Sequence, residues 1–256
     1  MKTGVKSIEL ADFDEIKPEV NQLEWICKEL RYQIPGVRID STDTIGHPMR
    51  MWEWGRILRL FKEHFGYPFN TRGKDIDVLD IGTAVSLIGP ALSYLGCCVV
   101  ETDSDPGWRV PRNMIKQFLD NSAPHGGLFD WYNIGFGGLR EQVPDQSGYT
   151  DGFDVVMTIS TIEHVETSLE LQAWKEMYDM LKPGGLMIVT MDCFAKAVKG
   201  YKYDHVRYTN YDMELVRERV NELKAYGMAP TGDEDYRWHG VHVDDGSFAW
   251  ISMVKL

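Results

Sequence analysis

From about residue 75 onward, short apolar runs alternate with stretches of helical periodicity. The runs are nearly continuous in apolar residues, which is typical of strands in a parallel sheet with helices on both faces. The predicted strands are residues 76–81, 97–102, 127–134, 153–159 and 186–191, and helices fit at 85–95, 111–120 and 168–181. This alternation indicates an α/β protein.

The C-terminal part has a different pattern. Helical periodicity at 211–226 is followed by two strand-like segments, at about 229–241 and 247–255. Asp244-Asp245-Gly246 lies between these segments, and Asp-Gly between apolar runs is a signal for a β-hairpin. Five parallel strands and an antiparallel pair make a seven-stranded sheet, so we expect a Rossmann-like fold.

The first part of the chain is predicted to be helical. Pro18 is well placed to begin a helix that ends before Pro35-Gly36. A second helix is predicted near 49–65. We therefore expect an N-terminal helical extension, or lid, over residues 1–70 and an α/β domain over 71–256.

Composition and charge exclude several classes of protein. The 27 basic and 39 acidic residues give a formal net charge of −12, which argues against a nucleic-acid partner. No apolar run reaches the ~18 residues of a membrane span. The first residues lack the apolar stretch of a secretory signal, and the cysteines lack metal-ligand spacing. We therefore expect a cytoplasmic protein with reduced thiols and no metal site.

A strand runs through a glycine turn into a helix at Val78–Ala84. Gly82 allows a ligand to approach the backbone closely. The N-terminus of the following helix offers unpaired N–H groups and a positive dipole end to an anionic group. For this segment alone, an ordinary strand–helix turn is an equally good interpretation.

An acidic residue, Asp103, lies at the end of the next predicted strand. A carboxylate at this place can accept both hydroxyls of a ribose. Glu101 lies on the same face of the strand and is the alternative acid. Acidic residues at strand ends also serve as turn caps, so the evidence for a nucleoside ligand comes from the turn and the acid together.

Two further segments carry a resemblance. Residues 153–165, FDVVMTISTIEHV, are an apolar strand followed by polar residues at the crevice end of the sheet. Residues 181–189, LKPGGLMIV, lead from a helix through a turn into a buried strand. Together with the glycine turn and Asp103, they resemble class I S-adenosylmethionine (SAM)-dependent methyltransferases of the small-molecule type. The chain departs from the family pattern D-x-G-x-G-x-G, since Ala84 and Ser86 stand at the last two glycine positions.

The resemblance implies SAM as cofactor and methyl transfer to a small-molecule or glycan-like acceptor, at oxygen or nitrogen. It implies that the turn holds the methionine part of SAM, that Asp103 binds the ribose and that Ser160 lies near the methyl group. The implied cofactor-binding residues are Asp80, Gly82, Thr83, Ala84, Asp103 and Ser160. Residues 130–134 are candidates for adenine binding.

Acceptor-binding candidates are the aromatic and basic residues Trp52, Arg207 and Tyr208. Trp52 could alternatively pack between helices. The loop at 199–210 could alternatively be a solvated connection without a role in binding. A hydroxyl acceptor benefits from a general base, and histidine titrates near neutral pH. His205 is the favoured base and His164 the second candidate, because His164 could instead cap a helix.

Two other functions stay open. A catalytically silent binding or structural subunit with a SAM-type fold is suggested by the reduced glycine pattern. An NAD-type oxidoreductase is less favoured, because the glycine pattern of dinucleotide sites is missing and the chain ends in an antiparallel pair.

Overall fold

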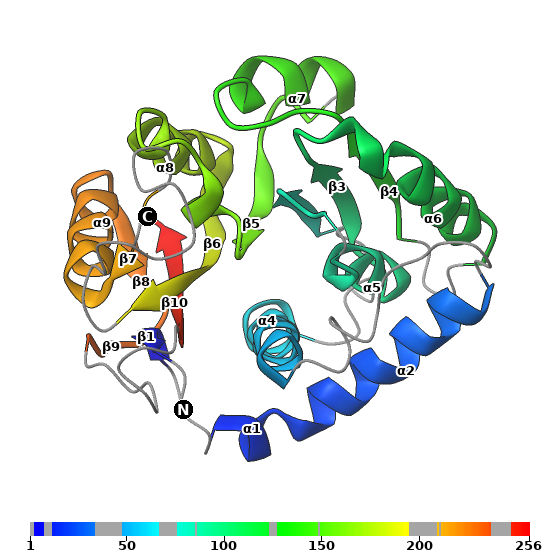
Figure 1. The fold of residues 1–256 in the computed structure, drawn as a ribbon, viewed down its shortest axis with the longest axis horizontal. Coiled ribbons are helices and arrows are strands. Elements are labelled where there is room, and N and C mark those ends of the chain that lie inside the picture. Colours follow the sequence, from blue (N-terminus) through cyan, green and yellow to red (C-terminus); the bar gives the residue numbers. More distant parts are fainter. Residues whose placement is uncertain are drawn as a thin grey trace. The chain divides into compact units, whose positions relative to one another are not determined.

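The computed structural model describes residues 3–7, 12–33, 48–66, 76–84, 86–122, 127–147, 149–194, 209, 211–236 and 247–256. The chain divides into two compact units (Figure 1). The N-terminal unit is Ala11–Gly135, and the C-terminal unit is Phe136–Leu256 together with Met1–Leu10.

Three parallel strands in the order β4–β3–β2 form the centre of the N-terminal unit. The strands are β2 (Asp77–Ile81), β3 (Cys98–Thr102) and β4 (Phe129–Tyr132). The register places Asp80 beside Glu101, and Glu101 beside Trp131. All five residues of β3 are buried, as the continuous apolar runs predict. The first three predicted strands are therefore confirmed.

Helices follow these strands. They are α5 (Ile88–Tyr94), the short 3₁₀ helix η1 (Pro106–Trp108) and α6 (Arg109–Ser122). Helix α5 packs against β3, and α6 packs against β4. The side chains of Ile115 and Leu119 form part of the buried face of α6.

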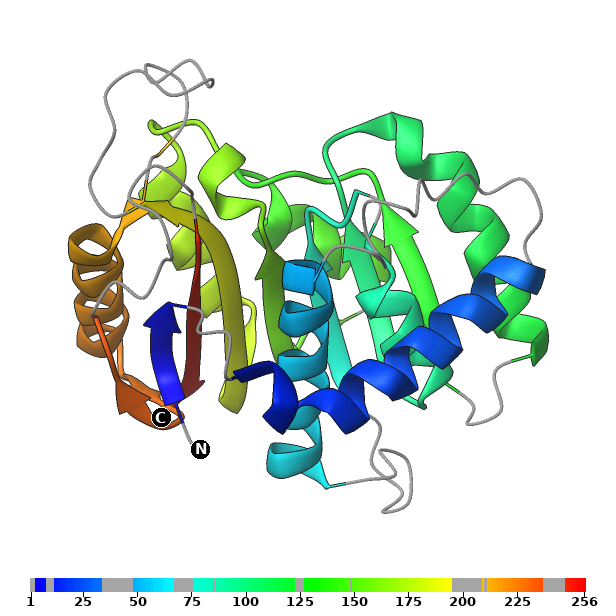
Figure 2. The same ribbon diagram turned by 60° about the horizontal axis from the view of Figure 1, so that its bottom comes forward.

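Two longer helices and one short helix precede the sheet of this unit. They are α1 (Asp12–Glu15), α2 (Lys17–Gln33) and α4 (Pro48–Phe65), so both long helices predicted from the sequence are confirmed. Helix α2 packs against α4, α5 and α6 (Figure 2). A Cβ atom on Gly55 would lie 2.8 Å from Val20 Cγ2, so glycine allows the close approach of α2 and α4. Arg59 and Lys62 of α4 both form ion pairs with Glu19 of α2, at 2.9 and 3.2 Å.

The C-terminal unit has a mixed sheet. Its strands are β1 (Thr3–Ser7), β5 (Phe153–Ile159), β6 (Leu181–Phe194), β7 (Tyr211–Asp212), β8 (Met228–Pro230), β9 (Asp233–Glu234) and β10 (Ser247–Lys255). Strand β5 is parallel to β6, and β10 is antiparallel to β6, β8 and β1. The remaining predicted strands are therefore present, with β8 and β9 both in the segment predicted at about 229–241, while β1 and β7 are additional.

Strand β1 corrects the expectation that the first part of the chain is helical throughout. Val5 is paired with Ile251 of β10. The segment Thr3–Ser7 contains a single large apolar residue, so it has no recognisable period. It forms a strand because β10 offers an unpaired edge, and that edge exists only in the folded protein.

The antiparallel pair predicted at the C-terminus is confirmed in a shorter form. Ala229 is paired with Val254, but β8 ends at Pro230. Proline cannot donate a ladder hydrogen bond, which restricts strands at such positions. The predicted turn at Asp244–Gly246 lies outside the described residues.

Helices of the C-terminal unit are α7 (Leu139–Ser147), the 3₁₀ helix η2 (Ile162–His164), α8 (Glu170–Asp179) and α9 (Met213–Ala225). Helix α8 packs against β5 and β6, and α9 packs against β7, β8 and β10. In the described part of the chain, no helix combines the length and the apolar character needed to cross a bilayer.

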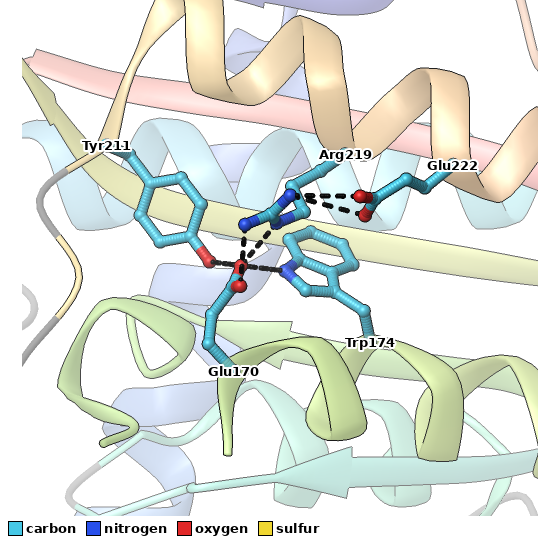
Figure 3. Close-up of polar contacts among 5 residues, drawn as sticks. All are labelled: Glu170, Trp174, Tyr211, Arg219 and Glu222. Carbon is cyan, nitrogen blue, oxygen red and sulfur yellow. Dashed lines mark hydrogen bonds and ion pairs between the residues drawn. The ribbon is translucent and has the colours of Figure 1, made fainter. Parts of the chain in front are cut away.

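A buried polar cluster connects α8, β7 and α9 (Figure 3). Glu170 Oε1 accepts hydrogen bonds from Trp174 Nε1, Tyr211 OH and Arg219 Nε, at 2.7, 2.6 and 2.7 Å. Arg219 Nη2 donates to Glu170 Oε2 at 2.8 Å, so the guanidinium contacts both carboxylate oxygens. Arg219 also contacts Glu222. A single buried carboxylate therefore connects three elements of this unit.

Candidate functional site

The loop after β2 folds back onto the end of β3. The N–H groups of Gly82 and Thr83 donate to Thr102 O at 2.7 and 3.3 Å, and Ser86 N donates to Thr83 O at 2.7 Å. Gly82 has a φ of +73°, a conformation that glycine adopts without steric cost. The predicted strand–turn–helix segment is therefore a tight turn, stabilised by one backbone hydrogen bond within the turn and two to the end of β3.

Asp103 lies beside this turn, immediately after β3. Its Oδ2 accepts a hydrogen bond from Ala84 N at 2.8 Å, and its Oδ1 accepts one from Asp105 N at 2.8 Å. Since each carboxylate oxygen can accept about two hydrogen bonds, each oxygen retains room for one more. Two such neighbouring acceptors suit the two hydroxyls of a ribose.

Ala84 has a strained backbone. Its φ is +38°, and among the described residues only Ala84 and Ser160 are non-glycine residues with positive φ. An L-residue in this region loses about 1–2 kcal/mol, and strain of this kind is concentrated at functional sites. Both residues were predicted from the sequence to bind the cofactor.

Two buried carboxyl groups lie below the turn. Asp80 of β2 and Glu101 of β3 are neighbours in the sheet, with exposed fractions of 1% and 0%. A Cβ atom on Gly89 of α5 would collide with Glu101 Oε1 and lie 3.2 Å from Asp80 Oδ2. Only glycine therefore leaves room for both carboxyl groups under α5.

Burial controls the protonation of this pair. It raises the pKa of Glu101 to about 7, although the Arg112 guanidinium acts in the opposite direction. Burial also raises the pKa of Asp80 well above its usual range, and the charge of Glu101 adds to this effect. The pair therefore holds a proton under conditions in which exposed carboxyl groups are ionised.

Arg112 of α6 is a site residue that the sequence analysis missed. Its Nε forms an ion pair with Glu101 Oε2 at 3.0 Å. Its Nη2 donates to the carbonyl oxygens of Thr83, Ala84 and Ser86, at 3.3, 2.8 and 2.9 Å. A sequence signal does exist, because Arg112 falls in register with the apolar stripe of its helix.

The segment after β4 also reaches Asp103. Asn133 Nδ2 donates to Asp103 O at 2.7 Å, and a Cβ on Gly135 would lie 2.9 Å from Ser104 Cβ. Asp130, at the start of the range considered for adenine, instead forms an ion pair with Lys116 of α6 at 3.0 Å. The polar contacts of this range with Asp103 therefore come from Asn133 and from the carbonyl oxygen of Tyr132, which accepts a hydrogen bond from Asp103 N at 3.2 Å.

In the C-terminal unit, Ser160 is the first residue after β5 and has a φ of +48°. Its N–H donates to Thr190 O at 3.0 Å and lies 3.1 Å from Thr190 Oγ1. Glu163 is buried, and its Oε1 accepts a hydrogen bond from Asp192 N at 3.0 Å. Glu163 therefore attaches η2 to β6, while its neighbour His164 is exposed to solvent.

The structure does not test the residues predicted to bind the acceptor or to act as the favoured base. Trp52 is 1% exposed within α4, so its acceptor contact stays a prediction. His205, Arg207 and Tyr208 lie outside the described residues, and their roles stay predictions as well. Within the described ranges, no three Asp, Glu, His or Cys side chains are grouped as metal ligands.

No protein-family model and no curated protein matches the sequence. Solved structures do match. TehB from Haemophilus influenzae is 13% identical with a TM-score of 0.54, and the match covers 79% of this chain but only 62% of TehB. The N-methyltransferase NodS from Bradyrhizobium japonicum WM9, in complex with S-adenosylhomocysteine, is 17% identical with a TM-score of 0.53 over 92% of this chain and 98% of NodS.

The CurJ carbon methyltransferase is 11% identical with a TM-score of 0.57, and the match covers 96% of this chain and 68% of CurJ. At such identities the comparison establishes the fold, and it agrees with the parallel α/β arrangement predicted from the sequence. The chain therefore has the Rossmann-like fold of the class I SAM-dependent methyltransferases.

Proposed function

We propose that this protein is a SAM-dependent methyltransferase that acts on a small-molecule or glycan-like acceptor, at oxygen or nitrogen. The observation that carries the proposal is the arrangement of Asp103. Two backbone N–H groups fix its carboxylate beside the turn after β2, and both oxygens keep acceptor capacity for a ribose diol. In SAM-dependent methyltransferases of this fold, a site of this kind binds SAM.

The proposed cofactor site has a well-supported ribose end. Asp103 binds the ribose, and Asn133 holds the backbone of Asp103 from the neighbouring segment. At the methionine end, the proposed contacts are Asp80 and the turn at Gly82–Ala84. Ser160, with its strained backbone at the end of β5, is the proposed contact near the methyl group.

Bound SAM supplies a methyl group already activated on a sulfonium. The protein then contributes mainly alignment, which is worth up to ~7–11 kcal/mol in favourable cases. His205, or alternatively His164, removes the acceptor proton in this proposal. Trp52, Arg207 and Tyr208 orient the acceptor.

A SAM titration of the wild-type chain and of Asp103→Ala tests the proposal. Calorimetry should show SAM and S-adenosylhomocysteine binding to the wild type and at least tenfold weaker binding to the variant, because the ribose hydroxyls lose both acceptors. The matched control is Asp105→Ala, which changes the neighbouring turn but keeps the Asp103 carboxylate. Equal affinity of wild type and Asp103→Ala would remove Asp103 from the site, and NAD binding in place of SAM would contradict the proposal.

A catalytically silent SAM-fold subunit is the second candidate, and the turn itself favours it. The N–H groups of Gly82, Thr83 and Ala84 already donate within the protein. The carbonyl oxygens of this turn already accept hydrogen bonds from Arg112. The N–H groups must change partners before they can hold the methionine carboxylate. The same titration separates the candidates, since a silent module shows no binding at high micromolar SAM.

A further inference from the structure

Arg112 is a buried cation that the methyltransferase motifs do not account for. Its exposed fraction is 2%, and it shares the buried face of α6 with Ile115 and Leu119. Removing a guanidinium from water is costly unless carboxylate and carbonyl acceptors surround it. The position therefore requires the set of partners that the structure provides.

Those partners connect the turn after β2 to β3. One guanidinium nitrogen, Nη2, donates hydrogen bonds to the carbonyl oxygens of Thr83, Ala84 and Ser86. Nε, in the same plane, lies 3.0 Å from Glu101 Oε2. The rigid planar geometry of arginine allows one side chain to hold the carbonyl groups and the carboxylate at fixed positions relative to each other.

The turn backbone that Arg112 contacts is the same backbone that fixes the Asp103 carboxylate. The peptide N–H of Ala84 donates to Asp103 Oδ2, while the carbonyl oxygen of Ala84 accepts from Arg112. Ala84 also has the strained φ of +38°. An alanine does not prefer this conformation by itself, so contacts from outside the turn must stabilise it, and the Arg112 contacts are in the right place to do so.

We propose that Arg112, oriented by Glu101, is a positioning residue of the cofactor site. It holds the turn after β2 in the conformation that presents the Ala84 N–H to Asp103, and so fixes the ribose-binding carboxylate. The identity of the ligand rests on the proposed function, whereas the effect on the turn does not depend on it. Arg112 itself has no role in the chemical step.

The double variant Arg112→Met/Glu101→Gln provides the test. Removing Arg112 alone leaves Glu101 buried without a cation, which could prevent folding, whereas the double variant removes both charges at nearly constant volume. Arg112→Lys is the conservative variant, because it restores a cation that can donate to carbonyl groups. The matched control is Lys116→Met, which lies one turn further along α6 and pairs with Asp120 and Asp130.

Two measurements are made on each variant. Amide hydrogen exchange, without ligand, follows Ala84 and compares it with Val99 and Val100 in the centre of β3. Calorimetry then measures the dissociation constant of SAM. In the double variant, we expect the Ala84 amide to exchange at least tenfold faster, unchanged exchange at Val99 and Val100, and at least tenfold weaker SAM binding.

We expect Arg112→Lys to lie between wild type and the double variant, and Lys116→Met to stay within twofold of wild type in both measurements. Ala84 exchange within twofold of wild type in the double variant would overturn the inference. So would an equal rise at Val99 and Val100, because that would indicate general loosening of the sheet. If the wild type fails to bind SAM, the proposed function is wrong, and the Ala84 exchange alone decides the role of Arg112.

Discussion

At the scale of single residues, the positive-φ positions connect sequence and site. Ala84 and Ser160 are both non-glycine residues in a region that favours glycine, and each lies just after a strand, β2 or β5, of the parallel part of the sheet. The sequence predicts both positions from motifs at strand ends. It does not predict the strain, because the strain at Ala84 depends on Arg112 and Asp103, which are distant in the chain.

Ala84→Gly tests the strain directly. Glycine removes a penalty of about 1–2 kcal/mol for an L-residue in this conformation and adds about 0.5–1 kcal/mol of chain entropy to the unfolded state. We therefore expect the free energy of unfolding to rise by about 0–1.5 kcal/mol in urea denaturation. The control Ala91→Gly, in the middle of α5, should lower it by about 1 kcal/mol or more. An equal decrease of the free energy of unfolding in Ala84→Gly and Ala91→Gly would show that Ala84 is not strained.

Glu101 should make stability depend on pH. Its pKa is raised by burial from 4.5 to about 7, so between these values the folded state keeps a proton that the unfolded state has lost. The contribution is fully present below about pH 4.5 and disappears as the pH rises to about 7, with an upper limit of roughly 3 kcal/mol. The groups that face Glu101 are Asp80, Asp103 and Arg112.

In Glu101→Gln, the free energy of unfolding should therefore fall less steeply between pH 5 and 7 than in the wild type. Urea denaturation across this range measures the difference between the two slopes. Glu141→Gln, on the exposed face of α7, is the control and should keep the wild-type slope. A steeper fall in Glu101→Gln than in the wild type would contradict the sign of the predicted effect.

At the scale of elements, the sequence is most informative where a strand is buried on both faces. Strand β5 is buried at all seven positions, and its apolar run predicts its bounds fully. Strand β6 begins earlier than predicted, because Leu181 pairs with Phe153 before the register shifts to Val155 and Leu186. The predicted Pro-Gly-Gly turn thus forms an irregularity in the strand.

The cluster around Glu170 could not be predicted from sequence, because its members come from α8, β7 and α9. Glu170→Ala should lower the free energy of unfolding by about 3–5 kcal/mol, since it leaves Arg219 without its buried partner. Glu222→Ala is the matched control: Glu222 contacts the same guanidinium, but its side chain is 44% exposed. Glu222→Ala should lower the free energy of unfolding by less than about 1 kcal/mol.

Chemical denaturation with circular dichroism measures both variants. The double variant Glu170→Ala/Arg219→Ala should be more stable than the sum of the single effects implies, because no buried charge is left unpaired. Equal losses in Glu170→Ala and Glu222→Ala would mean that burial contributes nothing to this interaction.

At the scale of the whole molecule, periodicity and motifs predict the fold class and the placement of Asp103 beside the turn after β2. They do so because each feature is local in sequence: an apolar run, a glycine, an acid at a strand end. Arg112 and strand β1 were missed for the opposite reason. The apolar stripe of α6 indicates that position 112 is buried, but the partners of the guanidinium, Glu101 and the turn carbonyl groups, are distant in the chain. Strand β1 likewise depends on distant partners, because it pairs with β10 and β9.

Measuring both kcat and the dissociation constant of SAM should distinguish residues that bind the cofactor from residues that remove the acceptor proton. If a histidine acts as base, kcat should rise with pH through a pKa of roughly 6–7. His205→Ala or His164→Ala should then lower kcat by ~10²-fold while the dissociation constant of SAM stays nearly unchanged. Asp103→Ala should show the opposite split, with weakened SAM binding as its main effect.

The assay follows S-adenosylhomocysteine release with an acceptor found by screening hydroxyl and amine compounds and glycans. His64→Ala, on the exposed side of α4, is the control and should keep the wild-type kcat. A flat profile of kcat between about pH 5.5 and 8.5, around the ordinary histidine pKa of ~6.5, would exclude a histidine base if both histidine variants also stay active. Alignment of SAM and acceptor would then have to supply the whole rate acceleration, and His164 and His205 would have structural roles only.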